Sequence, residues 1–447
     1  MAAHSSPAPG TPAAPLGPPV TATSPDTGTF TGTDGTSGPG REPRTYIPTL
    51  ALTNVGIYLA LLTPVMVTMA FKVQSIVGEE RQAAVLGVVL GIGALFAMFS
   101  NPLAGRLSDR TASRFGRRRP WIVGGSVVGI AALWVVATAT TVPVLVVGWC
   151  LAQASLNAAL AATNATLPDQ VPVARRGLAS GLVGFGIPIA ILTGSILAGA
   201  FTDELLRFVV PGVVALVTAL LFAVFLKDRR LEHRPAARFG IKDFAGSFVF
   251  DVRKHPDFAW TWLSKFFVMF GYAGVATFMP YYLGTRFGLD EAATIAIIIT
   301  ANFASVGAML VSSFLGGYLS DKVGKRRPFV AAAGLIMVVG LVLLAFAPST
   351  GLVVLAQGII GFGAGSFLSV DLALATQVLP DLDDTAKDLG VLNIANALPQ
   401  SIAPLVAAPL LALGTAIGVG GYPFLYLVSA LVAATGAVLV YRVKSVR

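Results

Sequence analysis

Two charged side chains lie deep within long apolar segments of this 447-residue sequence. Lys265 lies in the segment that begins near Phe258, and Asp371 lies in the segment that ends near Leu379. If these segments are antiparallel helices, a rise of about 1.5 Å per residue places the two charges ~10 Å and ~12 Å from the same surface. A lone charge in mid-bilayer costs about 2.5–3.5 kcal/mol on insertion scales. We therefore predict an ion pair that carries a proton or opens when a solute binds. The alternatives are a purely structural pair and snorkelling of Lys265 to the surface.

Polar side chains also recur at helical spacing. Trp149, Gln153, Asn157 and Asn164 share about one quarter of a helix circumference. Amides hydrogen-bond hydroxyl groups and an indole stacks on a sugar ring, so this stripe suits a neutral polyhydroxylated ligand. The alternative is hydrogen bonding between helices. Trp262, Lys265, Met269 and Tyr272 form a second stripe, and Asn54 with Tyr58 a third.

The composition explains why such residues stand out. Hydrophobic residues make up 55% of the chain and charged residues only 12%, against roughly 25% charged in soluble domains. Runs of about 20 apolar residues, each long enough to span a bilayer, recur about twelve times. They begin near Ile47, Ala84, Trp121, Val144, Gly177, Phe208, Phe258, Ala292, Pro328, Gly351, Val391 and Tyr422. The sequence thus predicts an all-α polytopic membrane protein.

Basic residues set the predicted orientation. Most of the 31 Lys and Arg residues fall in loops on one side of the twelve runs; Lys72, Arg81, Arg207 and Arg286 are assigned to the other side. Loops rich in Lys and Arg stay in the cytoplasm, so we predict that both termini lie in the cytoplasm. The protein itself is predicted to lie in the cell membrane. The net charge of +9 therefore reflects topology, and we expect no nucleic-acid partner.

The chain divides into four predicted parts. Residues 1–44 form a Pro/Gly/Thr-rich disordered tail, residues 45–226 and 258–447 form two six-helix halves, and residues 227–257 form a cytoplasmic linker. Within the linker, Ile241–Val252 is either an amphipathic surface helix or an irregular segment. One cysteine, Cys150, and three scattered histidines offer no disulfide, metal site or catalytic cluster. We expect no cofactor, no metal and no enzyme activity.

Two short motifs repeat between the halves. Gly105–Arg110 resembles Gly317–Lys322, and Leu167–Asp169 resembles Leu379–Asp381. Both repeats are offset by 212 residues (321 − 109 and 379 − 167). A constant offset indicates a duplicated six-helix unit. Membrane transporters that are built from such repeats bind substrate at the interface of the repeats.

The loop after Gly317 reads Asp-Lys-Val-Gly-Lys-Arg-Arg-Pro and is similar to the loop motif of the major facilitator superfamily. The first copy, Gly105 to Pro120, has four extra residues before Gly116, a form that resembles the glycoside-pentoside-hexuronide and sucrose-transporter-like symporters. This resemblance implies a major facilitator fold of twelve helices in two pseudo-symmetric halves.

The resemblance also implies a gate. In the family, the motif locks the cytoplasmic side, so Asp109 should face the helix that begins near Val391 and Asp321 the helix that begins near Gly177. Gly105 and Gly317 should allow close helix approach. The alternative is that the arginines serve only as topology charges. The predicted gating residues are Gly105, Asp109, Arg110, Gly116, Arg117, Arg118, Gly317, Asp321, Lys322, Gly324 and Arg326.

Because helices one, four, seven and ten line the cavity in this family, the resemblance selects the pathway residues. They are Asn54, Tyr58, Trp149, Gln153, Asn157, Lys265 and Tyr272, with Asp371 and Lys265 as the coupling pair and Asn396 and Gln400 as a second set. No Asp or Glu occurs between Ala84 and Arg106, where melibiose-type sodium symporters carry them.

The predicted function is proton-coupled symport of a small polar solute, a sugar or glycoside, by a monomer in the lipid bilayer. The alternatives are an efflux antiporter for amphipathic compounds and a membrane solute sensor that does not transport.

Overall fold

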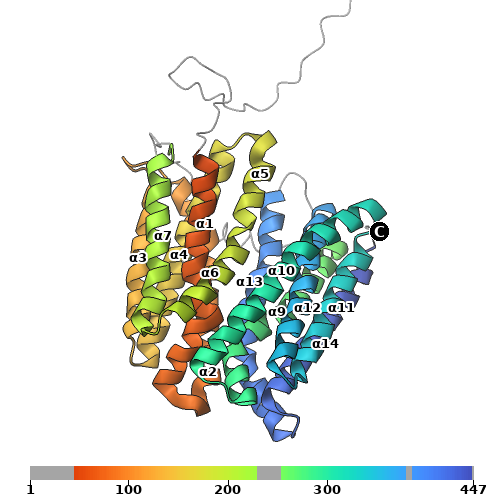
Figure 1. Cartoon of the computed structure of the whole chain (residues 1–447). Coiled ribbons are helices and arrows are strands. Elements are labelled where there is room, and N and C mark those ends of the chain that lie inside the picture. Colours follow the sequence, from red (N-terminus) through yellow and green to blue (C-terminus); the bar gives the residue numbers. More distant parts are fainter. Residues whose placement is uncertain (1–44, 229–252, 379–384, 445–447) are drawn as a thin grey trace, which may run out of the picture. The chain divides into compact units, whose positions relative to one another are not determined.

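The computed structural model describes residues 45–228, 253–378 and 385–444, and helices account for nearly all of these residues. The elements of the first half, in chain order, are α1 (Tyr46–Thr63), η1 (Pro64–Thr68), α2 (Met69–Asp109), α3 (Arg119–Thr138), α4 (Val142–Gln170), α5 (Val173–Gly184), α6 (Gly186–Ala200) and α7 (Glu204–Phe225). Those of the second half are α9 (Pro256–Phe287), α10 (Glu291–Val323), α11 (Arg327–Ala345), α12 (Thr350–Gln377), α13 (Thr385–Ala416), α14 (Gly421–Leu439) and η2 (Val440–Arg442). The predicted all-helical class is confirmed (Figure 1).

The described helices provide the predicted membrane passes. Ten are long and apolar enough to cross a membrane, or eleven if the two parts of α9, bent by 45°, count as one span. The first of these is a run of 64 residues, Tyr46–Asp109, and at about 1.5 Å per residue it is roughly three times too long for one crossing. It breaks at Gly78, whose φ of 71° and ψ of −178° are not helical, so it supplies two passes.

Short connections and local caps define where the helices begin and end. Asp203 and Asp290 accept hydrogen bonds from the backbone N–H of Leu206 (2.9 Å) and Ala293 (2.8 Å) and so cap α7 and α10. Proline occupies the first turn of α3, α4, α9 and α11, where its missing N–H costs nothing. Gly288 and Gly324 end α9 and α10 in the left-handed conformation.

Small residues let the helices of each half pack closely. In the first half, α1 packs on α7 where a side chain at Gly56 would meet Thr218, and α3 packs on α4 where Gly125 faces Ala159. In the second half, α9 packs on α14 where Gly271 faces Ala433. Such small contacts are the usual basis of helix association in membranes.

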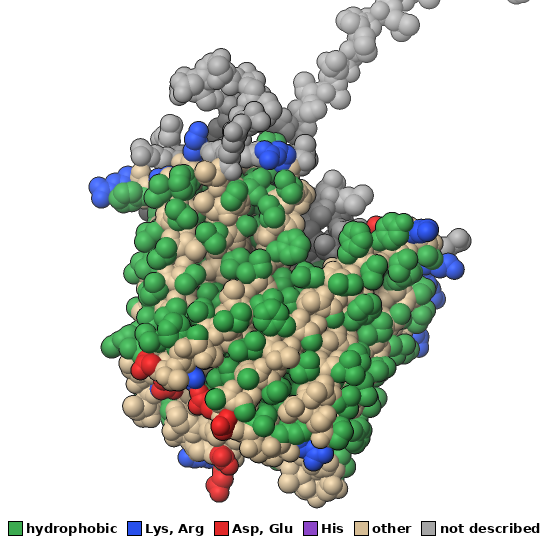
Figure 2. Space-filling view, in the orientation of Figure 1, with side chains coloured by type: hydrophobic (Ala, Val, Ile, Leu, Met, Phe, Trp, Pro, Cys, Tyr) green, Lys and Arg blue, Asp and Glu red, His purple; other side chains and the backbone are tan. Residues whose placement is uncertain are grey.

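The charged residues separate toward two ends of the bundle. Figure 2 shows hydrophobic side chains over the face of the helices, with mostly basic side chains at one end and acidic ones at the other. We call the end with the loops at residues 110–118 and 324–326 the motif end. The other, the opposite end, carries Glu79, Glu80, Asp203, Glu204, Asp290 and Glu291.

The two halves meet toward the opposite end. There the Tyr281 hydroxyl donates to the Ala70 carbonyl oxygen (2.7 Å), Arg207 pairs with Glu291, and Asn302 Nδ2 donates to Ser195 Oγ (2.7 Å). The helices also touch on this side of the bundle: α2 meets α13 where Gly87 lies against Pro404, and α6 meets α10 where Gly199 lies against Ile295.

Several predictions fall outside the described residues. The tail at residues 1–44, most of the linker including Ile241–Val252, and the second Leu-Pro-Asp motif at residues 379–381 are among them.

Candidate functional site

The predicted ion pair between Lys265 and Asp371 is confirmed. Lys265 Nζ on α9 lies 2.8 Å from Asp371 Oδ2 on α12, and the two side chains are 8% and 3% exposed. Lys265 therefore does not snorkel to the surface. A buried pair of this kind contributes little net stability, but removing one partner leaves a costly uncompensated charge.

Apolar packing surrounds this pair and fixes its helices. Phe367, Val370 and Leu374 flank Asp371 on α12, and all three are fully buried in one core cluster of the second half. On α9, Trp262 Nε1 donates to the Val391 carbonyl oxygen of α13 (2.9 Å), and Ser264 Oγ donates to Gly436 O of α14 (2.7 Å). These bonds set the rotation of α9, and with it the direction of Lys265.

Two of the predicted amides form a hydrogen-bonded unit on α4. Asn157 Nδ2 donates to Gln153 Oε1 (3.0 Å) and to the Gln153 backbone oxygen (2.8 Å). Gln153 and Asn157 are both buried, at 7% and 8% exposed. The Gln153 amide nitrogen and the Asn157 carbonyl oxygen are not used in this unit, so it still offers a donor and an acceptor.

The structure corrects the expectation for Trp149. Its indole is fully buried and lies directly against Gly93 of α2, at the position that a side chain there would occupy. Trp149 thus fills the contact between α4 and α2 and has no open face on which a sugar ring could stack. Trp149, Gln153 and Asn157 lie on one face of α4, as predicted, but Trp149 packs against α2.

The remaining predicted pathway residues lie on the expected helices. Asn54 and Tyr58 of α1 pack against Gly186 of α6, and Asn54 Nδ2 donates to the Leu50 carbonyl oxygen (3.0 Å). Asn54 Oδ1 is buried without a hydrogen-bond partner among the described residues. Tyr272 of α9 packs at the border of two core clusters.

The second set, on α13, is partly exposed. Gln400 Nε2 donates to the Asn396 backbone oxygen (3.3 Å), and Gln400 itself is exposed. Asn396 Oδ1 is buried and has no hydrogen-bond partner in the described part of the chain.

The first copy of the loop motif forms an ion network within its own half. Arg118, only 4% exposed, contacts Asp109 Oδ1 (2.5 Å) and donates to Ser108 Oγ (2.6 Å), while Arg117 pairs with Asp169 (2.6 Å). Asp228 accepts hydrogen bonds from the backbone N–H groups of Arg118 (2.7 Å) and Arg119 (2.8 Å) and so caps α3.

The expected gate contacts are absent from the described residues in this conformation. Asp109 bonds Arg118 instead of facing α13, and a side chain at Gly105 would meet no atom within 4 Å. In the second copy, Asp321 pairs with Arg326, and a side chain at Gly317 would only reach Ser369 at 3.9 Å. The physical reason is that the halves meet toward the opposite end, so the expected close approach at the motif end is not formed.

The other motif residues have local roles in this conformation. Gly116 adopts a φ of 102°, which a side chain would strain, and lies against Asp228. Gly324 ends α10 with a φ of 68°, and Lys322 is exposed in the last turn of that helix. Arg110 follows the end of α2.

Sequence reasoning missed one buried charge. Lys72, assigned only to the outer side, lies within α2 at 5% exposed; its Nζ donates to Ala137 O (2.7 Å) and to Glu204 Oε2 (3.0 Å). The signal was present in the apolar residues on both sides of Lys72, which extend the first run to Val77.

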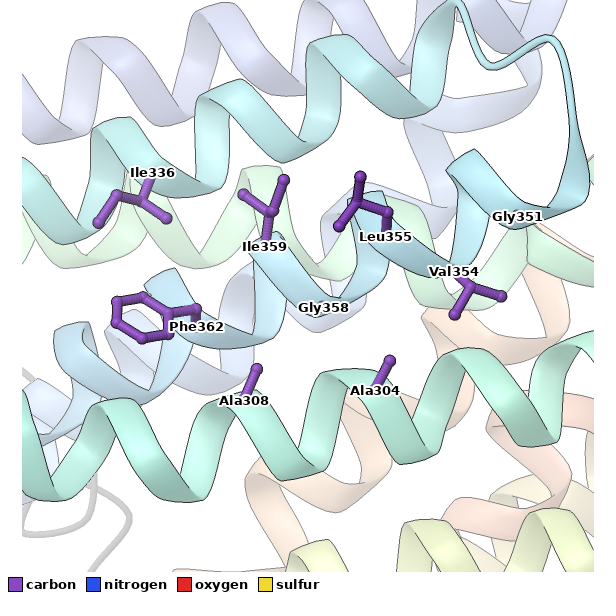
Figure 3. A pocket seen from close by; sticks show the side chains of 9 residues that line it. All are labelled: Ala304, Ala308, Ile336, Gly351, Val354, Leu355, Gly358, Ile359 and Phe362. Atoms are coloured by element: carbon purple, nitrogen blue, oxygen red, sulfur yellow. The ribbon is translucent and has the colours of Figure 1, made fainter.

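One pocket among the described residues lies apart from this site. It is a groove of about 500 Å³ between α10, α11 and α12 (Figure 3). Its walls are Ala304, Ala308, Ile336, Gly351, Val354, Leu355, Gly358, Ile359 and Phe362. These side chains offer no hydrogen-bonding group, so the groove suits hydrocarbon and not a polar solute.

The fold and the paired loop motifs define a class of membrane transporter, and comparison with known families agrees. The family model of the Major Facilitator Superfamily matches residues 49–310 and 291–447. The chain belongs to this superfamily, whose members are transporters of small solutes and not enzymes.

Individual relatives differ in what they carry. The cis,cis-muconate transport protein of Acinetobacter baylyi is 24% identical over 81% of this chain and 88% of its own length. The multi-drug resistance efflux pump PmrA of Streptococcus pneumoniae is 25% identical over 68% of this chain and 74% of its own. The crystal structure of a point mutant of the nucleoside transporter NupG superposes with a TM-score of 0.69 at 14% identity, over 89% of this chain and 99% of that one. None of these matches supports the glycoside-pentoside-hexuronide branch.

Proposed function

We propose that this protein is a proton-coupled symporter of a small polar solute, and that Asp371 is the residue that carries the proton. The observation that supports this most is the buried contact between Lys265 and Asp371. In a membrane interior such a pair is retained at a cost, and ionisable residues there commonly mark ion and proton pathways.

The pair suggests how coupling works. A proton on Asp371 removes its charge and weakens its hold on Lys265, so the two helices α9 and α12 lose an electrostatic link. When solute is bound and Asp371 is protonated, the equilibrium shifts between the state that is open to one side of the membrane and the state that is open to the other. The proposed orientation puts the motif end and both termini in the cytoplasm, and on that orientation the observed closure toward the opposite end corresponds to an inward-facing state.

The amide unit of Gln153 and Asn157 supports a polar solute that carries hydroxyl groups, such as a sugar, a glycoside or a sugar acid. The fold relative that carries nucleosides and the sequence relative that carries muconate are both transporters of polar compounds. We propose the monomer as the transport unit, because its first half carries the amide unit of Gln153 and Asn157 and its second half carries the ion pair of Lys265 and Asp371.

Export of an amphipathic compound is the second candidate function. It is favoured by the similarity to the efflux pump PmrA over two thirds of the chain. The two candidates differ in direction, since a symporter accumulates solute with the proton gradient and an antiporter expels it.

The test is uptake of a panel of labelled polar solutes into proteoliposomes under an imposed proton gradient. Asp371→Asn is compared with Asp290→Asn, which removes a carboxylate that only caps α10. We expect gradient-dependent accumulation that fails in the first variant and persists in the second. Accumulation unaffected by Asp371→Asn would refute the coupling role. Flux of amphipathic compounds under an inverted gradient would establish export, and binding without any flux would establish a sensor.

A further inference from the structure

We propose that Lys265 is the recognition group for an anionic solute, a small organic acid with a carboxylate or sulfonate group, and that Asp371 competes with this anion for the lysine. The inference rests on the proposed function, because it names the solute class of the same site.

The charge balance of the site carries the argument. The Lys265 ammonium group is balanced by one carboxylate, at 2.8 Å, and both are almost fully buried. A proton that neutralises Asp371 leaves this ammonium group buried without a counter-ion, which is the unfavourable state of a buried pair. A neutral solute does not relieve that cost, whereas a solute anion does.

The exchange balances in charge and atoms. The proton binds a carboxylate oxygen of Asp371, the carboxylic acid releases Nζ of Lys265, and the solute anion takes its place beside Nζ. The site holds zero net charge before and after the exchange, since a proton and a monoanion enter together. Proton and anion therefore bind cooperatively, because each lowers the cost of the other.

Other buried basic residues are held differently. Lys72 is bound by the Ala137 carbonyl oxygen, which no proton can neutralise, in addition to Glu204. Arg118 is bound by Ser108 and Asp109 in the network of the loop motif. Lys265 differs from both because its partner, Asp371, is a buried carboxylate inside a helix that has no other charged residue.

No further charged group among the described side chains of α9, α10, α11, α12 and α14 lies near the depth of the pair. α12 carries Asp371 as its sole charged residue, and α14 carries none. The charged residues of α9, α10 and α11 otherwise lie in their first or last turns: Asp257, Arg286, Glu291, Asp321, Lys322 and Arg327. The exchange between Asp371 and a solute anion thus has no competing ion at this level of the described bundle.

The experiment uses solute pairs that differ in charge but little in shape. Proteoliposomes with the full-length protein receive glucuronate with glucose, galacturonate with galactose, and short aliphatic carboxylates and sulfonates with the corresponding alcohols. An inward proton gradient is applied, and mass spectrometry measures which compounds the vesicles retain. We expect the acid of a pair to accumulate and its neutral counterpart to be excluded.

Either other result overturns the inference. Accumulation of the neutral member alone would refute the anion class while leaving proton-coupled symport intact. Absence of gradient-driven uptake in every pair would refute both the anion class and the proposed symport of a polar solute.

Variants separate recognition from a structural role. Lys265→Met should lower acid uptake about 10- to 100-fold, the range expected for loss of a charge-assisted hydrogen bond. Lys265→Arg should retain most of it, as should Lys444→Met, which alters an exposed lysine of the same half outside the loop motif. Asp371→Asn imitates the protonated acid, so acid exchange should persist without pH dependence while accumulation is lost.

The double variant K265M/D371N guards against misfolding, because it removes both charges and leaves none unpaired. We expect it to be inserted in the membrane but inactive toward acids. Acid uptake at the original rate in this variant would mean that the pair is structural and that the inference is wrong.

Discussion

Tyr281 and Tyr282 are neighbours in α9, yet their hydroxyl groups serve different halves of the molecule. Tyr281 donates to the Ala70 carbonyl oxygen across the interface of the halves (2.7 Å), whereas Tyr282 donates to the Leu344 carbonyl oxygen within the second half (2.8 Å). Both residues are buried tyrosines of the same helix. Substituting one or the other therefore tests closure of the opposite end and packing of the second half separately.

Tyr281→Phe should favour opening at the opposite end. A neutral hydrogen bond contributes about 0.5–1.5 kcal/mol, so its loss should raise the open population about 2- to 10-fold. Spin labels at the exposed residues Glu80 and Thr415, in a Cys150→Ala background, report the distance between the halves. Tyr282→Phe is the control and should leave this distribution unchanged. Equal distributions in both variants would show that the Tyr281 bond does not hold the halves together.

Gly105→Ala should be neutral or slightly stabilising in the observed conformation, because a side chain there would meet no atom within 4 Å and alanine is the better helix former. If Gly105 must approach another helix when the motif end closes, the same change should slow transport. Thermal unfolding and solute counterflow are measured together. Gly124→Ala, also free of neighbours on α3, should change neither quantity. Normal transport by the Gly105 variant would show that this glycine is not required for gating.

Trp149 and Gln153 should respond differently to substitution although they share one face of α4. Trp149→Phe leaves a void beside Gly93 and should lower the midpoint of thermal unfolding while keeping solute affinity. Gln153→Leu removes the amide that accepts from Asn157 and should weaken solute affinity about 10-fold. Affinity is read from the concentration dependence of uptake. A loss of affinity in the Trp149 variant comparable to that of Gln153→Leu would show that the indole takes part in solute binding.

Lys72→Met should destabilise the first half by about 1–3 kcal/mol, because the Ala137 carbonyl oxygen loses its buried donor. Glu204→Gln should cost less, since the Glu204 side chain is 43% exposed and its ion pair is screened by solvent. Thermal unfolding of the purified protein ranks the two. The reverse order would show that the ion pair, and not the hydrogen bond to Ala137, dominates at this lysine.

Much of the architecture follows from the sequence because bilayer thickness fixes the length of each apolar run. The pairing of Lys265 with Asp371 was predictable for the same reason: two isolated charges at similar depth have few other partners that lower their cost. Membership of the major facilitator superfamily followed from the loop motif, whereas the sugar-symporter branch rested on one loop and gained no support from the relatives.

Contacts between helices were less predictable. A polar stripe gives the face of α4 but not which helix covers it, so Trp149 was assigned to the pathway although it packs on Gly93. The partner of Asp109 depends on the conformational state, and here the nearby Arg118 satisfies it. The burial of Lys72 within a helix was missed because the apolar run continues up to the break at Gly78, where no polar loop marks the end of the helix.

That break has a consequence for how the protein is made. A single residue, Gly78, joins a helix of the first pass to a helix of the second, and no slack exists for one to enter the bilayer long before the other. The two are therefore expected to enter the membrane as a hairpin, with Glu79, Glu80 and Arg81 at its tip. On the proposed orientation, with both termini in the cytoplasm, insertion of this hairpin carries three adjacent charged residues across the membrane.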